Sequence, residues 1–265
     1  MRQDTWAEGD QYERYVGRWS RPVADAFLEW VACSPRCSWL DVGCGTGALT
    51  LKILEDCSPR SIHGIDPSAG FIGHARKKID DARVVLSEGG AEAIPFEEES
   101  LDAVVSGLVL NFVPDPRAGL AEMVRVTRPG GTVAVYVWDY AGKMELMRYF
   151  WDAAVKLNPA ARDLDEGSRF PICNLDALCA LFQDAGLEQV EGRNIDVSTK
   201  FKNFDDYWTP FLGGQGPAPG YAKGLNDSDR EALRDLLMQT LPMESDGSIA
   251  LIARALAVKG VRGQA

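Results

Sequence analysis

The stretch Leu40-Asp41-Val42-Gly43-Cys44-Gly45-Thr46-Gly47 decides the fold of this chain. It begins at the end of a short apolar run, which favours a buried strand, and it continues with a glycine at every second position. Glycine lets the backbone turn tightly between a strand and a helix, and it lets a ligand approach the main chain closely. The stretch therefore predicts a strand, a ligand-binding loop and a helix, in that order.

A carboxylate, Asp66, follows this loop at the spacing expected for a residue that binds ribose. Asp66 lies at the end of the next predicted strand, about 20 residues further along the chain. A carboxylate at that place can accept both hydrogen bonds from a ribose diol. We therefore expect a cofactor that contains adenosine, bound beyond the carboxyl ends of the strands. A glycine turn without any ligand is the alternative that Asp66 argues against.

The loop also fits a dinucleotide-binding pattern, with Gly43 and Gly45 as its first two glycines and Ala48 in third place. Asp41 discriminates between the two kinds of cofactor. A carboxylate two residues before the first glycine would lie beside a pyrophosphate and repel it. For a ligand that carries an ammonium and a sulfonium group, the same carboxylate is attractive. A NAD-linked oxidoreductase stays open as the alternative function.

Strands and helices alternate along the first half of the chain. Runs rich in Val, Ile and Leu predict strands at 38–42, 61–65, 83–86, 101–106 and 132–138, and amphipathic segments predict helices at 48–56, 68–80 and 116–127. A helix is expected before them, capped by Ser20, and the sequence Arg128-Pro129-Gly130-Gly131 predicts a turn. Such alternation is typical of a parallel sheet with helices on both faces.

The second half is less regular. We expect a helix at 143–157, a helix that Asn174 caps and Gly186 ends, a strand at 189–197, a loop over 200–226, a helix with Ser228 and Glu231 as its capping box, and a strand at 249–258. Aromatic residues in or beside these segments either line an apolar pocket or form a core of their own. They are Trp138, Tyr140, Tyr149, Phe150, Trp151, Tyr207 and Trp208.

Residues 38–138 resemble the class I S-adenosylmethionine-dependent methyltransferases, in particular the small-molecule group that includes the ubiquinone- and menaquinone-biosynthesis methyltransferases. The resemblance rests on motifs that occur in the family's order and spacing. They are Leu40–Gly47, Gly64-Ile65-Asp66-Pro67-Ser68, Glu88-Gly89-Gly90-Ala91-Glu92-Ala93-Ile94-Pro95-Phe96, Leu101–Ser106 and Arg128–Gly131.

The resemblance implies an α/β fold: a Rossmann-like, mostly parallel sheet of seven strands, the last of them antiparallel, with helices on both faces. We expect a single methyltransferase domain over 1–265 with a helical and loop lid. The lid segments are expected at about 1–20, 140–172 and 200–245.

The resemblance also implies which residues hold S-adenosyl-L-methionine. Asp41 and the backbone of the glycine loop would hold the methionine part, and Asp66 the ribose. The other residues lie beside the adenine, along the methionine side or in the N-terminal lid. The full set is Asp41, Gly43, Cys44, Gly45, Thr46, Gly47, Asp66, Pro67, Ser68, Gly90, Ala91, Glu92, Ser106 and Arg18.

Two positions depart from the family pattern. Gly90 stands where the family usually has an aspartate that accepts a hydrogen bond from the adenine amino group, so the Ala91 backbone, Glu88 or Glu92 must take its place. Asn111 lies in the segment after the fourth strand where many relatives have a histidine. A histidine base is therefore absent at that place.

The chemistry expected is methyl transfer to a small, largely apolar or aromatic molecule. A base is needed only if the acceptor arrives protonated. Asp139, after the fifth strand, and Tyr15, in the N-terminal lid, are the candidate catalytic residues. A protein that binds the cofactor without catalysis is a further alternative, and the scattered cysteines argue against a thiol or arsenical methyltransferase.

Composition limits the partners. The chain of 265 residues has a net charge of −11, and an acidic surface repels nucleic acid and anionic membranes. No apolar stretch resembles a signal peptide or a membrane span, so we expect a cytoplasmic protein. The six cysteines show no ligand spacing, so we expect free thiols and no metal. The sequence does not indicate an oligomeric state.

Overall fold

The computed structural model describes residues 17–213 and 216–264, without the side chain of Arg18. These residues divide into two compact units. Residues 20–137, 172–195 and 255–264 form what we call the sheet unit, and residues 17–19, 138–171, 196–213 and 216–254 form the aromatic unit. The organisation as one domain with three lid segments stays a prediction.

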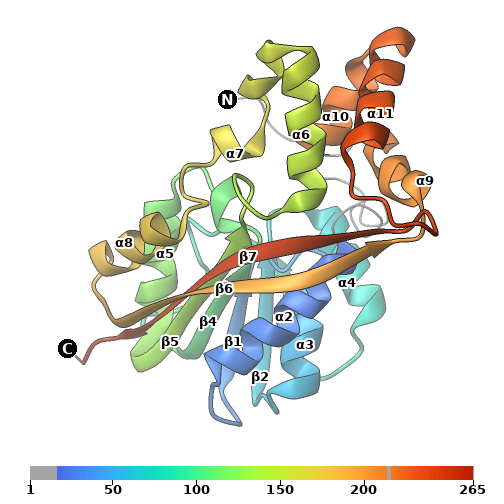
Figure 1. Ribbon diagram of the computed structural model, residues 1–265. Coiled ribbons are helices and arrows are strands. Elements are labelled where there is room, and N and C mark those ends of the chain that lie inside the picture. The colour runs from blue at the N-terminus through green and yellow to red at the C-terminus, as the bar shows by residue number, and fades with distance from the viewer. Residues whose placement is uncertain (1–16, 214–215, 265) are drawn as a thin grey trace. The chain divides into compact units, whose positions relative to one another are not determined.

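The described residues contain a sheet of seven strands in the order β3-β2-β1-β4-β5-β7-β6 (Figure 1). The strands are β1 (Ser38–Val42), β2 (Ser61–Asp66), β3 (Val84–Glu88), β4 (Leu101–Gly107), β5 (Thr127–Trp138), β6 (Leu187–Phe201) and β7 (Ile249–Arg262). The first five pair in parallel with their neighbours. The strand order confirms the Rossmann-like fold that the sequence predicted.

Strand β7 runs antiparallel to β5. Near the start of β5, the Arg262 guanidinium donates to the Thr127 carbonyl oxygen, and just after the end of β5 the Asp139 N–H donates to the Arg254 carbonyl oxygen. Higher numbers in β7 therefore face lower numbers in β5. The mixed sheet has the antiparallel last strand that the family resemblance implies.

The strand order reverses beside β1. Chain connections lead from β1 through β2 to β3 in one direction and from β4 to β5 in the other. Because parallel crossovers are right-handed, the helices of the two directions cover opposite faces of the sheet. In open α/β sheets, ligands bind beyond the carboxyl ends of the strands at such a reversal, which here lies at β1 and β4.

The helices of the sheet unit follow the predicted segments closely. They are α2 (Arg18–Val31), α3 (Ala48–Asp56), α4 (Ala69–Lys78), η2 (Leu110–Phe112), α5 (Pro116–Val126) and α8 (Leu175–Asp184). Ser68 caps α4 by accepting from the Phe71 N–H, and Asn174 caps α8 as predicted. The predicted cap of the first helix is wrong, because Ser20 lies inside α2 and is buried.

The predicted turn at 128–131 lies within the bounds of β5. Leu101 pairs with Thr127 and Ala103 pairs with Thr132, so β5 has extra residues at this point and bulges. Gly130 has φ +73°, a backbone conformation that favours glycine. The Arg-Pro-Gly-Gly sequence thus makes a bulge at the beginning of the strand instead of a turn before it.

The aromatic unit is helical and has a core of large rings. Its helices are α6 (Glu145–Leu157), η3 (Pro159–Asp163), α7 (Glu166–Arg169), α9 (Phe204–Trp208), η4 (Thr209–Leu212), α10 (Pro217–Gly224) and α11 (Asp227–Thr240). The Phe150 and Phe211 rings stack with centroids 4.5 Å apart, and the buried Tyr207 hydroxyl donates to the Leu146 carbonyl oxygen at 2.9 Å. Most of the aromatics that the sequence left open are therefore core residues here.

Two predictions in this unit are wrong. The segment 200–226, expected to be a loop, contains α9, η4 and α10. Buried aromatic residues stabilise these short helices. Their glycine and proline residues are typical of loops, so the sequence pattern did not predict helices. Helix α11 is capped by Asn226, whose Oδ1 accepts from the Asp229 N–H at 2.9 Å, and not by Ser228.

Candidate active site

The glycine loop turns through conformations that other residues rarely adopt. Gly43, Gly45 and Gly47 have φ angles of +74°, +52° and +87°. A Cβ atom on Gly43 would lie 2.5 Å from the Val109 side chain, so this glycine is also required by close packing. A Cβ atom on Gly45 would meet no atom nearer than 4.0 Å, so open space lies beside the middle of the loop.

Backbone hydrogen bonds fix the loop to the end of β2. The N–H groups of Gly43 and Cys44 both donate to the Ile65 carbonyl oxygen, at 2.7 and 2.9 Å. The Gly45 N–H donates to Asp66 Oδ2 at 3.0 Å, and the Ser68 N–H donates to Asp66 Oδ1 at 2.8 Å. The carboxylate predicted to hold a ribose is therefore held rigidly at the loop.

Asp41 is a buried carboxylate at the end of β1. Its side chain accepts a hydrogen bond from Thr50 Oγ at 2.6 Å. Burial, and less strongly the negative charge of Asp66, raise the pKa of the Asp41 carboxyl to about 7, although the Thr50 hydrogen bonds lower it. Burial raises the pKa of Asp66 as well.

The Asp41 and Asp66 carboxylates lie close enough to repel, and both residues are at most 7% exposed. Within residues 17–213 and 216–264, no lysine, arginine or histidine forms an ion pair with either of them. Buried charges are normally paired. A ligand that brings a positive charge and a pair of hydroxyl donors therefore fits these two residues, as S-adenosylmethionine does.

Cys44 and Thr46 are buried members of the loop. The Cys44 thiol packs away from the loop, in an apolar cluster with Ile72, Ala75 and Leu86, and burial raises its pKa. A ligand beside the glycine loop would thus meet the backbone of Cys44 and not its sulfur. The prediction for Cys44 rests on that backbone.

Ser106 lies near the end of β4, beside β1. Its hydroxyl donates to the Val42 carbonyl oxygen at 2.8 Å, and the residue is buried. The hydrogen bond ties β4 to the residue before the glycine loop. Ser106 therefore lies beside the end of β1, which carries Asp41, although its hydroxyl proton is already engaged.

The loop after β3 holds Gly90, Ala91 and Glu92. A Cβ atom on Gly90 would meet no atom within 4 Å, whereas Ala91 lies near Gly119 of α5. The Glu92 carboxylate accepts from the Asp115 N–H at 3.1 Å. This hydrogen bond holds Glu92 at the beginning of α5 and leaves its carboxylate with further acceptor capacity, so its role as a substitute for the aspartate that Gly90 replaces stays a prediction.

For three predicted residues, a place at this cluster stays a prediction. Tyr15 and the Arg18 side chain lie outside the described part of the chain. Asp139 belongs to the aromatic unit, where its carboxylate accepts from the Lys143 N–H at 2.9 Å in a turn. Pro67, in contrast, is exposed beside Asp66 and Ser68.

Asn111, which the sequence offers as a further candidate after the fourth strand, is buried in the structure. Asn111 lies in η2, just beyond β4, and is 7% exposed. Neither its Oδ1 nor its Nδ2 has a hydrogen-bond partner among the described residues. The sequence signal was its position where relatives have a histidine, but a sequence does not reveal that an amide is buried and unpaired.

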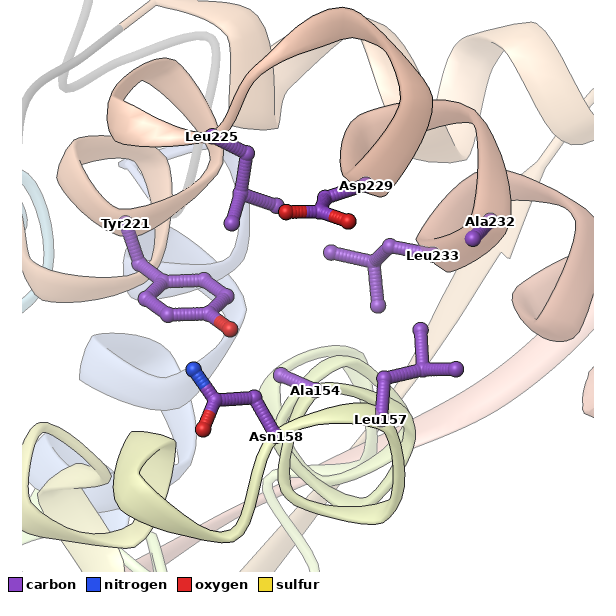
Figure 2. Close-up of a pocket in the computed structure, with 8 residues that line it drawn as sticks. All are labelled: Ala154, Leu157, Asn158, Tyr221, Leu225, Asp229, Ala232 and Leu233. Atoms are coloured by element: carbon purple, nitrogen blue, oxygen red, sulfur yellow. The ribbon is translucent and has the colours of Figure 1, made fainter.

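A separate groove of about 330 Å³ lies within the aromatic unit. Figure 2 shows that residues of α6, α10 and α11 line it, with the Tyr221 hydroxyl toward Asn158 and Asp229 across from both. The lining is otherwise aliphatic. It shares no residue with the glycine-loop cluster.

Comparison with known proteins identifies the same region as the sequence motifs. Residues 40–135 match the family described as "Methyltransferase domain". The chain is 34% identical to 2-methyl-6-phytyl-1,4-hydroquinone methyltransferase 2, chloroplastic, of Oryza sativa subsp. japonica, over 51% of this chain and 39% of that protein. It thus spans less than half the length of that relative.

A bacterial relative is matched over more of its length. The chain is 30% identical to a demethylmenaquinone methyltransferase of Lysinibacillus sphaericus over 62% of this chain and 75% of that protein. In fold it is similar to phosphoethanolamine N-methyltransferase 2 of Haemonchus contortus, solved with S-adenosyl-L-methionine, with a TM-score of 0.61, 16% identity and coverage of 96% of this chain and 56% of that chain. Fold, motifs and relatives agree, and the chain belongs to the class I S-adenosylmethionine-dependent methyltransferases.

Proposed function

We propose that this chain transfers the methyl group of S-adenosylmethionine to a small, largely apolar or aromatic molecule. The observation that carries the proposal is the pair of buried carboxylates, Asp41 and Asp66, at the glycine loop without a described counter-ion. A NAD cofactor would bring a pyrophosphate to this place, and its charge would be repelled.

Each group of residues has a separate task in this proposal. Asp66 accepts from the ribose hydroxyls, Asp41 attracts the ammonium group, and the glycine loop lets the methionine part approach the backbone. Asp66 is already oriented by the Gly45 and Ser68 N–H groups, so its geometry is prepared before the ligand arrives. The remaining residues lie on the adenine side, which has Pro67, Ser68, Gly90 and Ala91, or support the methionine side, which has Thr46 and Ser106.

When bound, the cofactor supplies a methyl carbon made electrophilic by the neighbouring sulfonium. The task of the protein is to align that carbon with the acceptor and to exclude water. Asp139 and Tyr15 remain the proposed bases for an acceptor that arrives protonated. The hydrogen bond from the Lys143 N–H leaves Asp139 with further acceptor capacity, as a base requires.

The class of acceptor is supported by two observations. Relatives named as hydroquinone and demethylmenaquinone methyltransferases indicate an aromatic ring that carries oxygen. The net charge of −11 disfavours nucleic acid as the substrate.

No helix of the described residues is long and apolar enough to cross a bilayer. A cytoplasmic location is proposed from the sequence alone.

Titration calorimetry with S-adenosylhomocysteine and with NADH tests the cofactor. We expect the first to bind and the second not to bind, and the opposite result would refute the proposal. A screen of a metabolite library with methyl-labelled cofactor then tests the reaction. Label found only in tRNA or protein would overturn the small-molecule acceptor, and tight cofactor binding without any transfer would favour a binding protein without catalysis.

A further inference from the structure

Asn111 has an unusual environment for an amide. Only 7% of the residue is exposed, and both polar atoms of its side chain lack a partner in the described part of the chain. Buried amides are almost always hydrogen-bonded, because leaving their donor and acceptor unpaired costs the hydration that water gave them. An amide of this kind indicates a ligand that supplies the missing partners.

The position of Asn111 connects it to the candidate active site. It lies in η2, which follows β4 at the reversal of the strand order. Val109, two residues earlier, packs so closely on Gly43 that a Cβ atom there would lie 2.5 Å from it. The segment that carries Asn111 therefore borders the glycine loop.

The order of the strands separates Asn111 from the ribose end of the site. Asp66 ends β2, Asp41 lies on β1 and Asn111 follows β4, and these three strands are consecutive in the sheet. If Asp66 holds the ribose and Asp41 the amino-acid part, β4 is the next place along the edge. The acceptor has to lie next to the sulfur-bound methyl group, in line with the bond from sulfur to methyl, and Asn111 borders the glycine loop from the β4 side.

We propose that the Asn111 carboxamide holds a hydroxyl group of an aromatic methyl acceptor, an inference that rests on the proposed function. In the proposed function the ribose hydroxyls of the cofactor already have Asp66 as their partner, and its ammonium group has Asp41. A carboxamide offers a donor, Nδ2–H, beside an acceptor, Oδ1, and a hydroxyl is the small group that needs both. Asn111 is then a residue that determines specificity and positions the acceptor; it takes up no proton itself.

The test compares two probes that differ in the hydroxyl alone. Protein saturated with S-adenosylhomocysteine is titrated with 1-naphthol and with 1-methoxynaphthalene by calorimetry. We expect the parent protein to bind 1-naphthol about tenfold more tightly than 1-methoxynaphthalene. This is the gain in affinity expected when a hydroxyl forms well-aligned hydrogen bonds to a carboxamide. Asn111→Leu should bind both probes with the same affinity, and its affinity for S-adenosylhomocysteine should stay unchanged.

A second readout does not depend on the ligands. Because the amide is unpaired in the free protein, Asn111→Leu should raise the midpoint of denaturation by urea. Thr199→Val is the matched control, since Thr199 is fully buried with an unpartnered hydroxyl but belongs to the aromatic unit. It should raise the midpoint too and leave the preference for 1-naphthol intact. Asn111→Ala repeats the binding test in a smaller side chain if the leucine does not fit.

Several outcomes would overturn the inference. One is a parent protein that binds neither probe, or binds both with equal affinity. Another is a set of Asn111 variants that still bind 1-naphthol more tightly than 1-methoxynaphthalene. A third is a loss of affinity for S-adenosylhomocysteine in these variants, which would assign the amide to the cofactor. Failure of the parent itself to bind S-adenosylhomocysteine is distinguishable from these, because it refutes the proposed function.

Discussion

The sheet unit and the aromatic unit use buried groups in opposite ways. In the sheet unit, polar side chains such as Asp41, Asp66 and Asn111 are buried with fewer partners than their chemistry requires. In the aromatic unit, Phe150, Tyr207 and Phe211 bury rings against one another, and the Tyr207 hydroxyl has its partner. The first pattern costs stability, as expected of the proposed binding site, whereas the second provides stability.

If this contrast is correct, substitutions in the two units separate stability from cofactor affinity. The largest effect is expected for Phe150→Ala. The Phe150 ring is fully buried and stacks on Phe211, and removing such a ring costs about 3–5 kcal/mol of unfolding free energy. Urea denaturation measures the loss. Leu157→Ala on the same helix is the control, because Leu157 is 47% exposed and should cost far less. Equal losses in the two variants would contradict a core at Phe150.

Asp66→Ala should show the reverse pattern. We expect a loss of about 1.5–3 kcal/mol in the binding free energy of S-adenosylhomocysteine, because charge-assisted hydrogen bonds to the ribose disappear. Stability should fall by less than in Phe150→Ala, because relief from burying the carboxylate offsets part of the loss of its hydrogen bonds from the Gly45 and Ser68 N–H groups. Calorimetry measures the affinity, and Asp81→Ala, which removes a carboxylate paired with Arg83 outside the glycine loop, is the control. Unchanged affinity in Asp66→Ala would place the cofactor elsewhere.

How far the sequence predicts each unit follows the same division. The glycine loop, its flanking strands and Asp66 were predicted because positive φ angles and close approaches permit few residues, so the requirement is visible in the sequence. The helices within 200–226 were missed because they depend on buried contacts of Tyr207 and Phe211 with residues far away along the chain. The sequence indicated Asn111 only by its place after the fourth strand, since burial and missing hydrogen-bond partners are tertiary facts.

Asp41→Asn tests whether the unpaired carboxylate costs stability. The pKa of Asp41 is about 7 in the folded protein, above its usual value of 3.8, so the folded state binds more protons than the unfolded state between these values. The stability of the parent should therefore fall as the pH rises from about 4 to 7, by at most about 1.4 kcal/mol per pH unit. The carboxamide of the variant is neutral at every pH, so Asp41→Asn should lose this pH dependence and be more stable than the parent at pH 7. Urea denaturation at a series of pH values measures both effects.

The same substitution should weaken binding of S-adenosylmethionine, because the ammonium loses its partner. In the parent, affinity should fall as the pH drops below about 7 and Asp41 takes up a proton. Asp102→Asn is the control on the neighbouring strand. Burial raises the pKa of Asp102, but hydrogen bonds from the Ser38 N–H and Arg128 outweigh it and lower the pKa, so its loss should destabilise the protein and leave affinity intact. A pH-independent affinity in the parent would exclude Asp41 from the cofactor contacts.

The smallest expected effect is a gain. Gly90 stands where the family usually has an aspartate, yet its backbone does not have a positive φ, and a Cβ atom there would meet nothing within 4 Å. The loop therefore accepts a side chain without strain, and Gly90→Asp should fold as well as the parent. If Gly90 lies at the adenine edge, the new carboxylate accepts from the adenine amino group, and calorimetry should show affinity for S-adenosylhomocysteine rising by about 1 kcal/mol.

Gly73→Asp is the control for this gain, because Gly73 has equal space around its Cβ position but lies on α4. Both variants add one negative charge, so a general electrostatic effect on the cofactor would appear in both. A gain in both variants, or in neither, would show that the missing aspartate is not what limits cofactor affinity in this chain. A gain confined to Gly90→Asp would instead locate the adenine, and would mean that the open space beside Gly90 belongs to the cofactor site.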